Sequence, residues 1–357
     1  MAKARCISLS LLLVLVACGG QRTSLNKSGS IPTGDAIPKE NWPEFVPDPS
    51  WQVAVAQERA TYAENRYSYE DNLQDYTASG DYLNWGLTER GGFGDVPGVM
   101  KLDETGVPMV MYDGEYYYNP VTISQFSLSE YGMFLRGSEP DLSKFWAGVN
   151  KLLELQREDG SFPYVFDFPY YLNTNYFRAP WTSGMAQGQA LSVLARAWHL
   201  RRDPRYIAAG NKAFDFLSKT VSNGGDTDDL SSLDPSLSSE IIIEEYPAEP
   251  PGFTLNGFMF AMLGVYDWAQ VDANLAKRNA ASFYFSEYVQ TLDHILPYYD
   301  LGGFSAYDLG HITYHREPLL YAYYHAIHIY ELHALYSITN DPVLKKYEML
   351  WRSDVSK

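Results

Sequence analysis

The chain has almost no cysteine, because only Cys6 and Cys18 occur among its 357 residues. Both lie close to the N-terminus, so the body of the chain carries neither a disulfide nor a thiol nucleophile. Basic residues are also few, since 27 Lys and Arg stand against 44 Asp and Glu and leave a net charge of −17. This balance argues against nucleic acid and against an anionic surface as broad partners.

Several motifs are absent as well. The sequence shows no phosphate loop, no dinucleotide fingerprint and no Ser-His-Asp order, and it contains no internal repeat. Its N-terminal apolar run covers only residues 9–17, which is too short to span a bilayer. The missing phosphate loop and dinucleotide fingerprint argue against nucleotide-dependent chemistry, and the missing Ser-His-Asp order argues against a serine hydrolase.

The N-terminus has the features of a signal peptide. Lys3 and Arg5 precede the apolar run, and the segment Leu-Val-Ala-Cys at 15–18 resembles a bacterial lipobox. We therefore expect residues 1–17 to be a lipoprotein signal peptide and Cys18 to carry a lipid anchor to the membrane. Gly19, rather than Asp, after the cysteine favours the outer membrane of the bacterial cell envelope. Cleavage removes Lys3 and Arg5, so the net charge falls from −17 to −19.

The rest of the chain divides by composition. Residues 18–50 are rich in Gly, Ser, Thr and Pro and predict a flexible tether. Residues 51–119 predict a mixed region in which two β-prone runs, 107–112 and 115–118, flank Asp113-Gly114, a hairpin signal.

Residues 120–357 indicate one helix after another. The expected helices are 121–136, 141–157, 182–200, 205–221, 254–270, 275–296, 318–337 and 341–352. The fold class that this pattern predicts is mainly α: an incomplete (α/α) toroid behind a small N-terminal β-hairpin region. Three long loops, 158–181, 222–252 and 297–317, are where such a toroid is expected to place its site.

One helix start is unusual. Gly184 and Gly188 lie one turn apart, beside Gln187 and Gln189, and a glycine inside a helix costs about 1 kcal/mol relative to alanine. The two glycines predict that a backbone or a ligand approaches closely. An aromatic loop ending at Trp181 precedes them, and 15% of the chain is aromatic, which suits stacking on sugars. The stretch predicts the floor of a carbohydrate cleft.

Blocks along 105–352 closely resemble the C-terminal domain of the D-glucuronyl C5-epimerases, which act on heparosan and heparan sulfate precursors. The blocks, in order, are Gly106-Val107-Pro108, the Tyr-rich strand through Tyr118 into Pro120 and Gln125, Trp181 with 185–189, Glu244-Glu245-Tyr246-Pro247, Leu255-Asn256-Gly257-Phe258, Tyr307-Asp308-Leu309 and Tyr324-His325. The resemblance implies proton removal and return at C5 of a uronic acid in a polysaccharide, without a cofactor.

The resemblance also implies site residues. The catalytic ones are Tyr246, Tyr307, Tyr324 and Glu245. Tyr307 and Tyr324 are expected to serve as acid and base on the two ring faces, Glu245 as a second candidate base, and Tyr246 to orient or protonate. The substrate-binding candidates are Tyr118, Gln125, Arg178, Trp181, Gln187, Gln189, Asn256, His311, Arg316 and His325. Tyrosine suits proton donation, whereas as a base it needs a cationic neighbour.

One position departs from the family pattern. Where the family has Tyr-Asp-Leu-Arg-His, this chain has Gly310 in place of the arginine that would pair with the uronate carboxylate. Arg178, Arg316 or His311 could take its place. The family's aspartate before the second catalytic tyrosine is here Tyr323.

Other interpretations stay open. A polysaccharide lyase would share the C5 proton removal, and an inert glycan-binding lipoprotein would not need the arginine. A glycosidase would need two carboxyl groups, for which Glu245 and Asp308 are the one pair to consider. His311, His315, His325 and His328 have side chains that could bind Zn²⁺, but no metal site is expected. A structural divalent cation and a homodimer stay open.

Overall fold

The computed structural model describes residues 45–65, 73–83, 93–173, 175–271, 273 and 275–355. The predicted signal peptide, Cys18 and most of the predicted tether therefore lie outside the described residues. The helices are α1 (Gln52–Asn65), α2 (Pro120–Leu135), α3 (Ser143–Leu155), α4 (Gly184–Arg201), α5 (Pro204–Leu217), α6 (Leu255–Ala269), α7 (Leu275–Tyr299), α8 (Gly310–Thr313), α9 (Ala322–Thr339) and α10 (Pro342–Val355).

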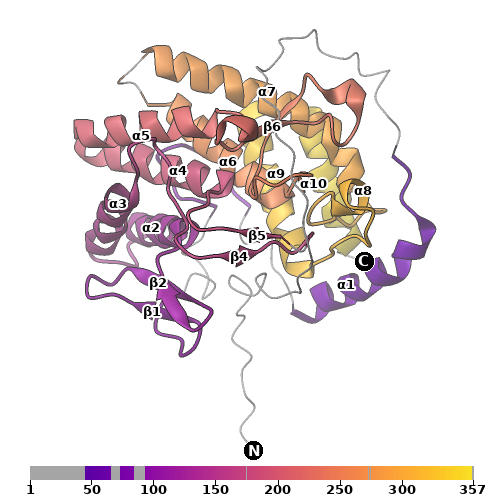
Figure 1. The fold of residues 1–357 in the computed structure, drawn as a ribbon, viewed down its shortest axis with the longest axis horizontal. Coiled ribbons are helices and arrows are strands. Elements are labelled where there is room, and N and C mark those ends of the chain that lie inside the picture. Colours follow the sequence, from indigo (N-terminus) through magenta and orange to yellow (C-terminus); the bar gives the residue numbers. More distant parts are fainter. Residues whose placement is uncertain are drawn as a thin grey trace, which may run out of the picture.

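The long helices pack as antiparallel pairs: α2 with α3, α4 with α5, α6 with α7, and α9 with α10 (Figure 1). The first helix of each pair also packs on the first helix of the next, so that α2, α4, α6 and α9 form an inner row and their partners an outer one. The helix α1 lies against α9 and α10. The predicted fold class, a mainly α and incomplete (α/α) toroid, is confirmed.

Proline and short polar side chains begin several of these helices. Pro120 and Pro204 each occupy the first turn, and the preceding Asn119 and Asp203 accept a hydrogen bond from a main-chain N–H of that turn. Proline lacks the N–H that would have no partner there, and the capping oxygen satisfies another. This local chemistry explains why most of the predicted helix starts agree with the structure to within two residues.

The strands are short. Three of them, β1 (Met100–Leu102), β2 (Pro108–Tyr112) and β3 (Glu115–Tyr117), form an antiparallel sheet in the order β1-β2-β3. Asp113 and Gly114 link β2 to β3 with φ of 48° and 87°, so the predicted hairpin is confirmed. Two further hairpins, β4 (Phe168–Pro169) with β5 (Tyr176–Phe177) and β6 (Thr227–Asp229) with β7 (Ile241–Ile243), lie in the long loops and were not predicted.

The two glycines that begin α4 are explained by packing rather than by a ligand. A Cβ at Gly184 would collide with the Glu244 carbonyl, and one at Gly188 with the Ala261 backbone in α6. From the other side, a Cβ at Gly264 would collide with the Gly188 carbonyl. The main chains of α4 and α6 therefore touch, and of the two alternatives that the sequence left, close approach of a backbone is the correct one.

Replacing Gly264 with Ala is expected to lower the free energy of unfolding by about 3 kcal/mol, because two packed backbones must move apart to admit one methyl group. The midpoint of urea unfolding, followed by circular dichroism, measures this loss. Gly94→Ala is the matched control, since a Cβ at that position meets nothing within 4 Å. Equal midpoints for the two variants would contradict the close approach.

Candidate active site

One pocket lies where the four inner helices begin. Its lining includes Thr122 and Gln125 from α2, Met185 from α4, Asn256 and Phe260 from α6, and Tyr323, Tyr324 and Ile327 from α9. It holds about 880 Å³ of space, part of it open to solvent. Because the N-terminal ends of α-helices carry partial positive charge, the pocket lies at the positive ends of four helix dipoles.

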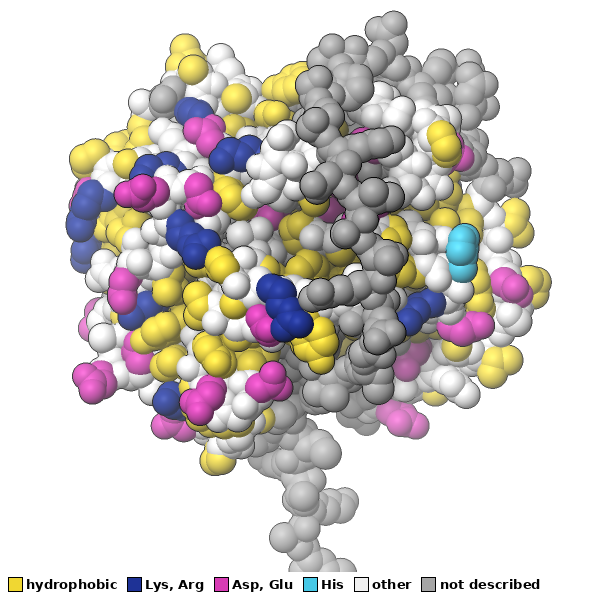
Figure 2. Space-filling model, in the orientation of Figure 1, with side chains coloured by type: hydrophobic (Ala, Val, Ile, Leu, Met, Phe, Trp, Pro, Cys, Tyr) yellow, Lys and Arg dark blue, Asp and Glu magenta, His cyan; other side chains and the backbone are white. Residues whose placement is uncertain are grey.

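Aromatic side chains form another wall of the pocket. Tyr112 stacks on Phe166 with ring centroids 3.9 Å apart, and Tyr164 stacks on Trp181 at 4.0 Å. The Trp181 indole donates a hydrogen bond of 2.9 Å to the Phe166 carbonyl, which fixes its orientation. This rigid aromatic wall of the pocket suits the apolar faces of sugar rings. Hydrophobic side chains also gather on the outer surface, at the middle of the face in Figure 2.

Glu245 is the one charged side chain among the lining residues that the structure describes. It is buried, and its Oε2 has no hydrogen-bond partner within the described chain. Burial raises the pKa of this carboxyl to about 8, with a smaller contribution in the same direction from Asp308. Gly257 makes room for it, because a Cβ there would collide with the Glu245 carboxyl group.

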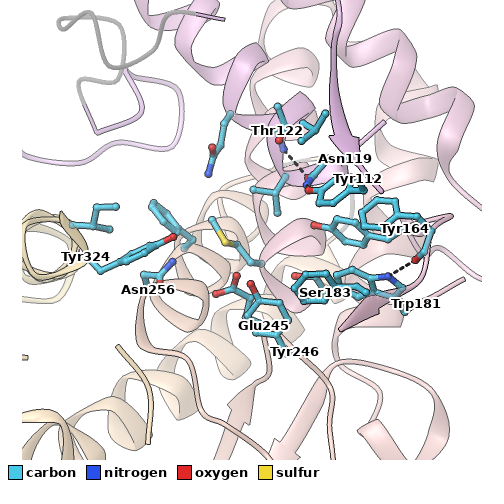
Figure 3. Close-up of a pocket in the computed structure, with 18 of the residues that line it drawn as sticks. Tyr112, Asn119, Thr122, Tyr164, Trp181, Ser183, Glu245, Tyr246, Asn256 and Tyr324 are labelled. Atoms are coloured by element: carbon cyan, nitrogen blue, oxygen red, sulfur yellow. Dashed lines mark hydrogen bonds between the residues drawn. The ribbon is translucent and has the colours of Figure 1, made fainter. Parts of the chain in front are cut away.

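The three predicted catalytic tyrosines lie together beside Glu245. Tyr246 and Tyr324 line the pocket, and the buried Tyr307 ring lies behind them, 4.6 Å from the Tyr324 ring. Figure 3 shows Tyr324 entering from α9 while Glu245 and Tyr246 enter from a different wall. Burial, and after it the Glu245 carboxyl, raises the pKa of Tyr246, Tyr307 and Tyr324 well above its usual range. These phenols therefore remain protonated and suit proton donation.

Of the predicted substrate-binding residues, Gln125, Trp181 and Asn256 line the pocket. Asn256 is buried, and its Oδ1 has no partner in the described part of the chain. Tyr118 is not a lining residue: its hydroxyl donates to Asp103 at 2.7 Å, and the Lys151 ammonium lies 4.3 Å from its ring centroid.

Two glutamines and two histidines that were predicted as sugar ligands are core residues outside the lining. The Gln187 amide accepts from the Phe162 N–H at 2.8 Å and donates to the Gly160 carbonyl at 3.2 Å, and Gln189 is fully buried. His325 Nδ1 accepts from the Ser305 N–H at 3.0 Å, and its ring stacks on Phe304.

His311 packs between Phe45 and Trp51, where burial lowers its pKa to about 4. The sequence predicts these glutamines and histidines as substrate ligands, but the structure places them in the core. Periodicity alone does not distinguish a helix face that packs in the core from one that lines a cavity.

The arginines that could replace the family's missing one do not line the pocket either. Arg178 is exposed and pairs with Asp167. Arg316 donates to the Tyr171 carbonyl at 2.9 Å and lies near enough to Asp308 to lower its pKa, although burial outweighs this effect. At Gly310 a Cβ would contact the Leu172 side chain. No cation therefore lines the pocket among the residues that the structure places.

Tyr323, which stands where the family has an aspartate, lines the pocket. Several lining residues were not predicted as site residues from the sequence: Tyr112, Asn119, Thr122, Tyr164, Phe166, Phe168 and Ser183. Two of them, Asn119 and Ser183, are the caps of α2 and α4, so the helix-start signals could have found them. In the described ranges no group of three or more His, Cys, Asp or Glu could hold a metal ion, and no helix there is long and apolar enough to cross a bilayer.

The stability of the fold is expected to peak at about pH 5–6. Burial raises the pKa of Glu245 and Asp226 to about 8, so the stability that these protonated carboxyls contribute is lost as the pH rises from the unfolded-state pKa through 8. Burial lowers the pKa of His311 to about 4 and of His325 to about 3, so their contribution is lost as the pH falls below 6.5. Urea midpoints from pH 4 to 9 measure the curve, and a midpoint that rises steadily from pH 6 to 9 would contradict it.

A family model and one curated relative name the same family. The family model described as "D-glucuronyl C5-epimerase C-terminus" matches residues 156–353. A D-glucuronyl C5-epimerase of Caenorhabditis elegans is 31% identical over 216 residues, which cover 58% of this chain and 34% of that protein. An uncharacterized protein of Methanocaldococcus jannaschii is 30% identical over 190 residues, or 53% of this chain and 56% of that protein.

The chain thus spans about a third and about half, respectively, of these two relatives. A solved structure of a family 76 glycoside hydrolase from a bovine Bacteroides thetaiotaomicron strain superposes with a TM-score of 0.43 at 13% identity. The superposition covers 67% of this chain and 48% of that one.

Proposed function

The chain belongs to the D-glucuronyl C5-epimerase family, and from this membership we propose that it inverts C5 of D-glucuronic acid, or of a related uronic acid, within a polysaccharide. The observation that carries the proposal is the meeting of Glu245, Tyr246 and Tyr324 in one aromatic-walled pocket (Figure 3). A base and a proton donor that enter a sugar site from different walls are what inversion at carbon requires.

Glu245 is the base in this proposal. A carboxyl with a pKa near 8 is partly ionised at neutral pH and holds a removed proton strongly, which matches a general base to its task. The sequence favoured Tyr307 and Tyr324 as the acid and base pair. A tyrosine base needs a cation beside it, and the lining residues described in the structure include none, so we assign both tyrosines to the acid side.

Tyr324 is the donor to the opposite ring face. Its ring comes from α9, and Glu245 comes from the segment after β7 (Figure 3). Tyr307 lies behind Tyr324, and Tyr246 lies beside Glu245, where its hydroxyl lowers the carboxyl pKa by hydrogen bonding. Trp181 is the stacking surface, and Gln125 and Asn256 are the amides that bind sugar hydroxyls.

Deuterium exchange tests the proposal. The protein is incubated in D₂O with N-acetylheparosan and with a panel of other uronans, and H5 is followed by NMR. We expect loss of the H5 signal and the growth of signals from the C5 epimer. No deuterium uptake in any uronan would overturn the activity, and absorbance at about 232 nm would instead indicate elimination by a lyase.

A glycan-binding lipoprotein without turnover is the second candidate, and one observation favours it. The family's arginine is absent, and neither Arg178 nor Arg316 lines the pocket. Binding of a uronan without exchange, unchanged in Tyr307→Phe, would support this role.

The lipid anchor at Cys18 is a proposal from the sequence. Incorporation of a labelled fatty acid that Cys18→Ala abolishes would support it, as would fractionation with the outer membrane. Equal labelling of the variant would contradict it.

A further inference from the structure

The pocket presents an electrostatic problem for the substrate that the proposed function requires. A uronate carries a carboxylate next to C5, and in the described lining the one charged side chain is the carboxyl of Glu245. Two carboxylates that share a buried site cannot both ionise without a large cost, so one of them retains a proton. The bound pair is therefore expected to hold one proton and one negative charge.

Beyond the helix ends, no cationic side chain that the structure describes acts on Glu245. Among the described residues, the ionisable groups that act on Glu245 or are acted on by it are Glu244, Tyr246, Tyr164, Tyr307, Asp308, Tyr324 and Glu331. All of these are acids. The helices α2, α4 and α6 contribute uncharged lining residues, such as Gln125, Met185 and Asn256. Arg316 lies beyond Asp308 and contacts the Tyr171 main chain. Among the described side chains, therefore, no cation could neutralise the uronate carboxylate in place of the shared proton.

We propose that Glu245 itself supplies the proton that neutralises the uronate carboxylate, and that the pocket consequently accepts uronic acid methyl esters as a second substrate class. This inference rests on the proposed function. In the first step the Glu245 carboxylic acid gives its proton to the substrate carboxylate, which leaves an ionised Glu245 beside a neutral uronic acid. This one proton transfer ionises Glu245, so that it can act as the base. It also makes the C5 proton more acidic, because the neighbouring carboxyl group of the substrate is now neutral.

The remaining steps conserve atoms and charge. The Glu245 carboxylate forms a bond to H5, the C5–H bond breaks, and its electron pair moves into the carboxyl group to give an enediolate. The Tyr324 hydroxyl protonates C5 on the other face and becomes a phenolate, which then recovers the proton from Glu245. The epimerised acid finally returns its carboxyl proton to Glu245, and the site is restored.

A methyl ester bypasses the first step, because its carboxyl group is already neutral. It needs only an ionised Glu245, whereas the free acid needs a protonated one at the moment of binding. The two substrates are therefore expected to respond to pH in opposite directions. The exchange rate of the ester should rise with pH until the pH reaches the pKa of Glu245. The exchange rate of the free acid should fall tenfold per pH unit above that pKa.

The experiment compares heparosan with its methyl-esterified form. Initial rates of H5 exchange in D₂O are measured by NMR between pH 6 and 9, with blanks lacking protein and with Glu245→Gln. The ester methyl signal reports any hydrolysis. Opposite pH slopes for the two polymers that Glu245→Gln abolishes would support the inference. Parallel slopes, or exchange of the acid without exchange of the ester, would overturn it while leaving the epimerase proposal standing. No exchange of either polymer would overturn both.

Binding gives an independent measurement. Calorimetry of a heparosan oligosaccharide at pH 9, in buffers of different ionisation enthalpy, counts the protons taken up on binding. The wild-type protein should take up close to one proton and Glu245→Gln none. Equal uptake by the two proteins would contradict the assignment of the shared proton to Glu245.

Discussion

Glu245→Gln is expected to slow deuterium incorporation at C5 by about 10²- to 10⁴-fold, the usual contribution of a positioned general base. The amide keeps the shape of the side chain beside Gly257 but cannot accept the C5 proton. The readout is the initial rate of H5 loss in D₂O, measured separately from the glucuronate and iduronate forms of the polymer. A two-sided mechanism predicts that the form whose C5–H bond faces Glu245 loses exchange most.

Glu244→Gln is the matched control for this variant. Glu244 is the preceding residue, it is fully buried, and it lies outside the pocket lining. Burial raises the pKa of Glu244 well above its ordinary value and so favours the neutral carboxyl, which an amide resembles in shape and charge. The substitution should therefore leave exchange within about threefold. If both variants lost activity equally, the effect would belong to the segment and not to the Glu245 carboxyl.

The two variants also separate catalysis from folding. The pKa of Glu245 is higher in the folded protein than in the unfolded chain. Its contribution to the free energy of unfolding is therefore lost as the pH rises through about 8. Glutamine does not titrate. Glu245→Gln should therefore be less sensitive than wild type to an increase from pH 7 to 9 in urea unfolding, while it is the less active protein at both.

The helices could be predicted because their causes are local. Asn119 with Pro120, and Asp203 with Pro204, specify helix starts within a few residues of sequence. The same is true of the turn at Asp113-Gly114, where two positive φ angles select those residue types. The short hairpins β4–β5 and β6–β7 could not be predicted this way, because each has only two or three residues per strand and depends on tertiary packing.

The site could be predicted only in part. Resemblance indicated Glu245, Tyr246 and Tyr324, which the fold brings to one pocket, and also Tyr307 directly behind them. Gln187, which the sequence predicts as part of the sugar floor, instead forms hydrogen bonds with the main chain of Gly160 and Phe162. The orientation of α4 depends on its backbone contact with α6 at Gly188 and Gly264. This contact joins residues far apart in the chain, so the residue spacing within either helix could not predict it.

Tyr324→Phe is expected to abolish inversion while exchange continues. Phenylalanine preserves the ring packing against Tyr307 but removes the hydroxyl that protonates the second face. Glu245 can still remove H5, exchange its proton with solvent and return deuterium to the same face. Deuterium should therefore accumulate at C5 of one epimer, with the rate of epimer formation lower by about 10²-fold or more.

The ratio of exchange to inversion distinguishes a donor from a residue that merely supports the pocket. A packing defect would reduce both rates together, whereas loss of the donor changes their ratio. Tyr321→Phe is the matched control, since Tyr321 is exposed, does not line the pocket and lies 5.9 Å from the Tyr324 ring. That variant should keep the wild-type ratio. If Tyr324→Phe kept it too, the proton donor would have to be sought first at Tyr246, the lining phenol that follows Glu245 in the chain.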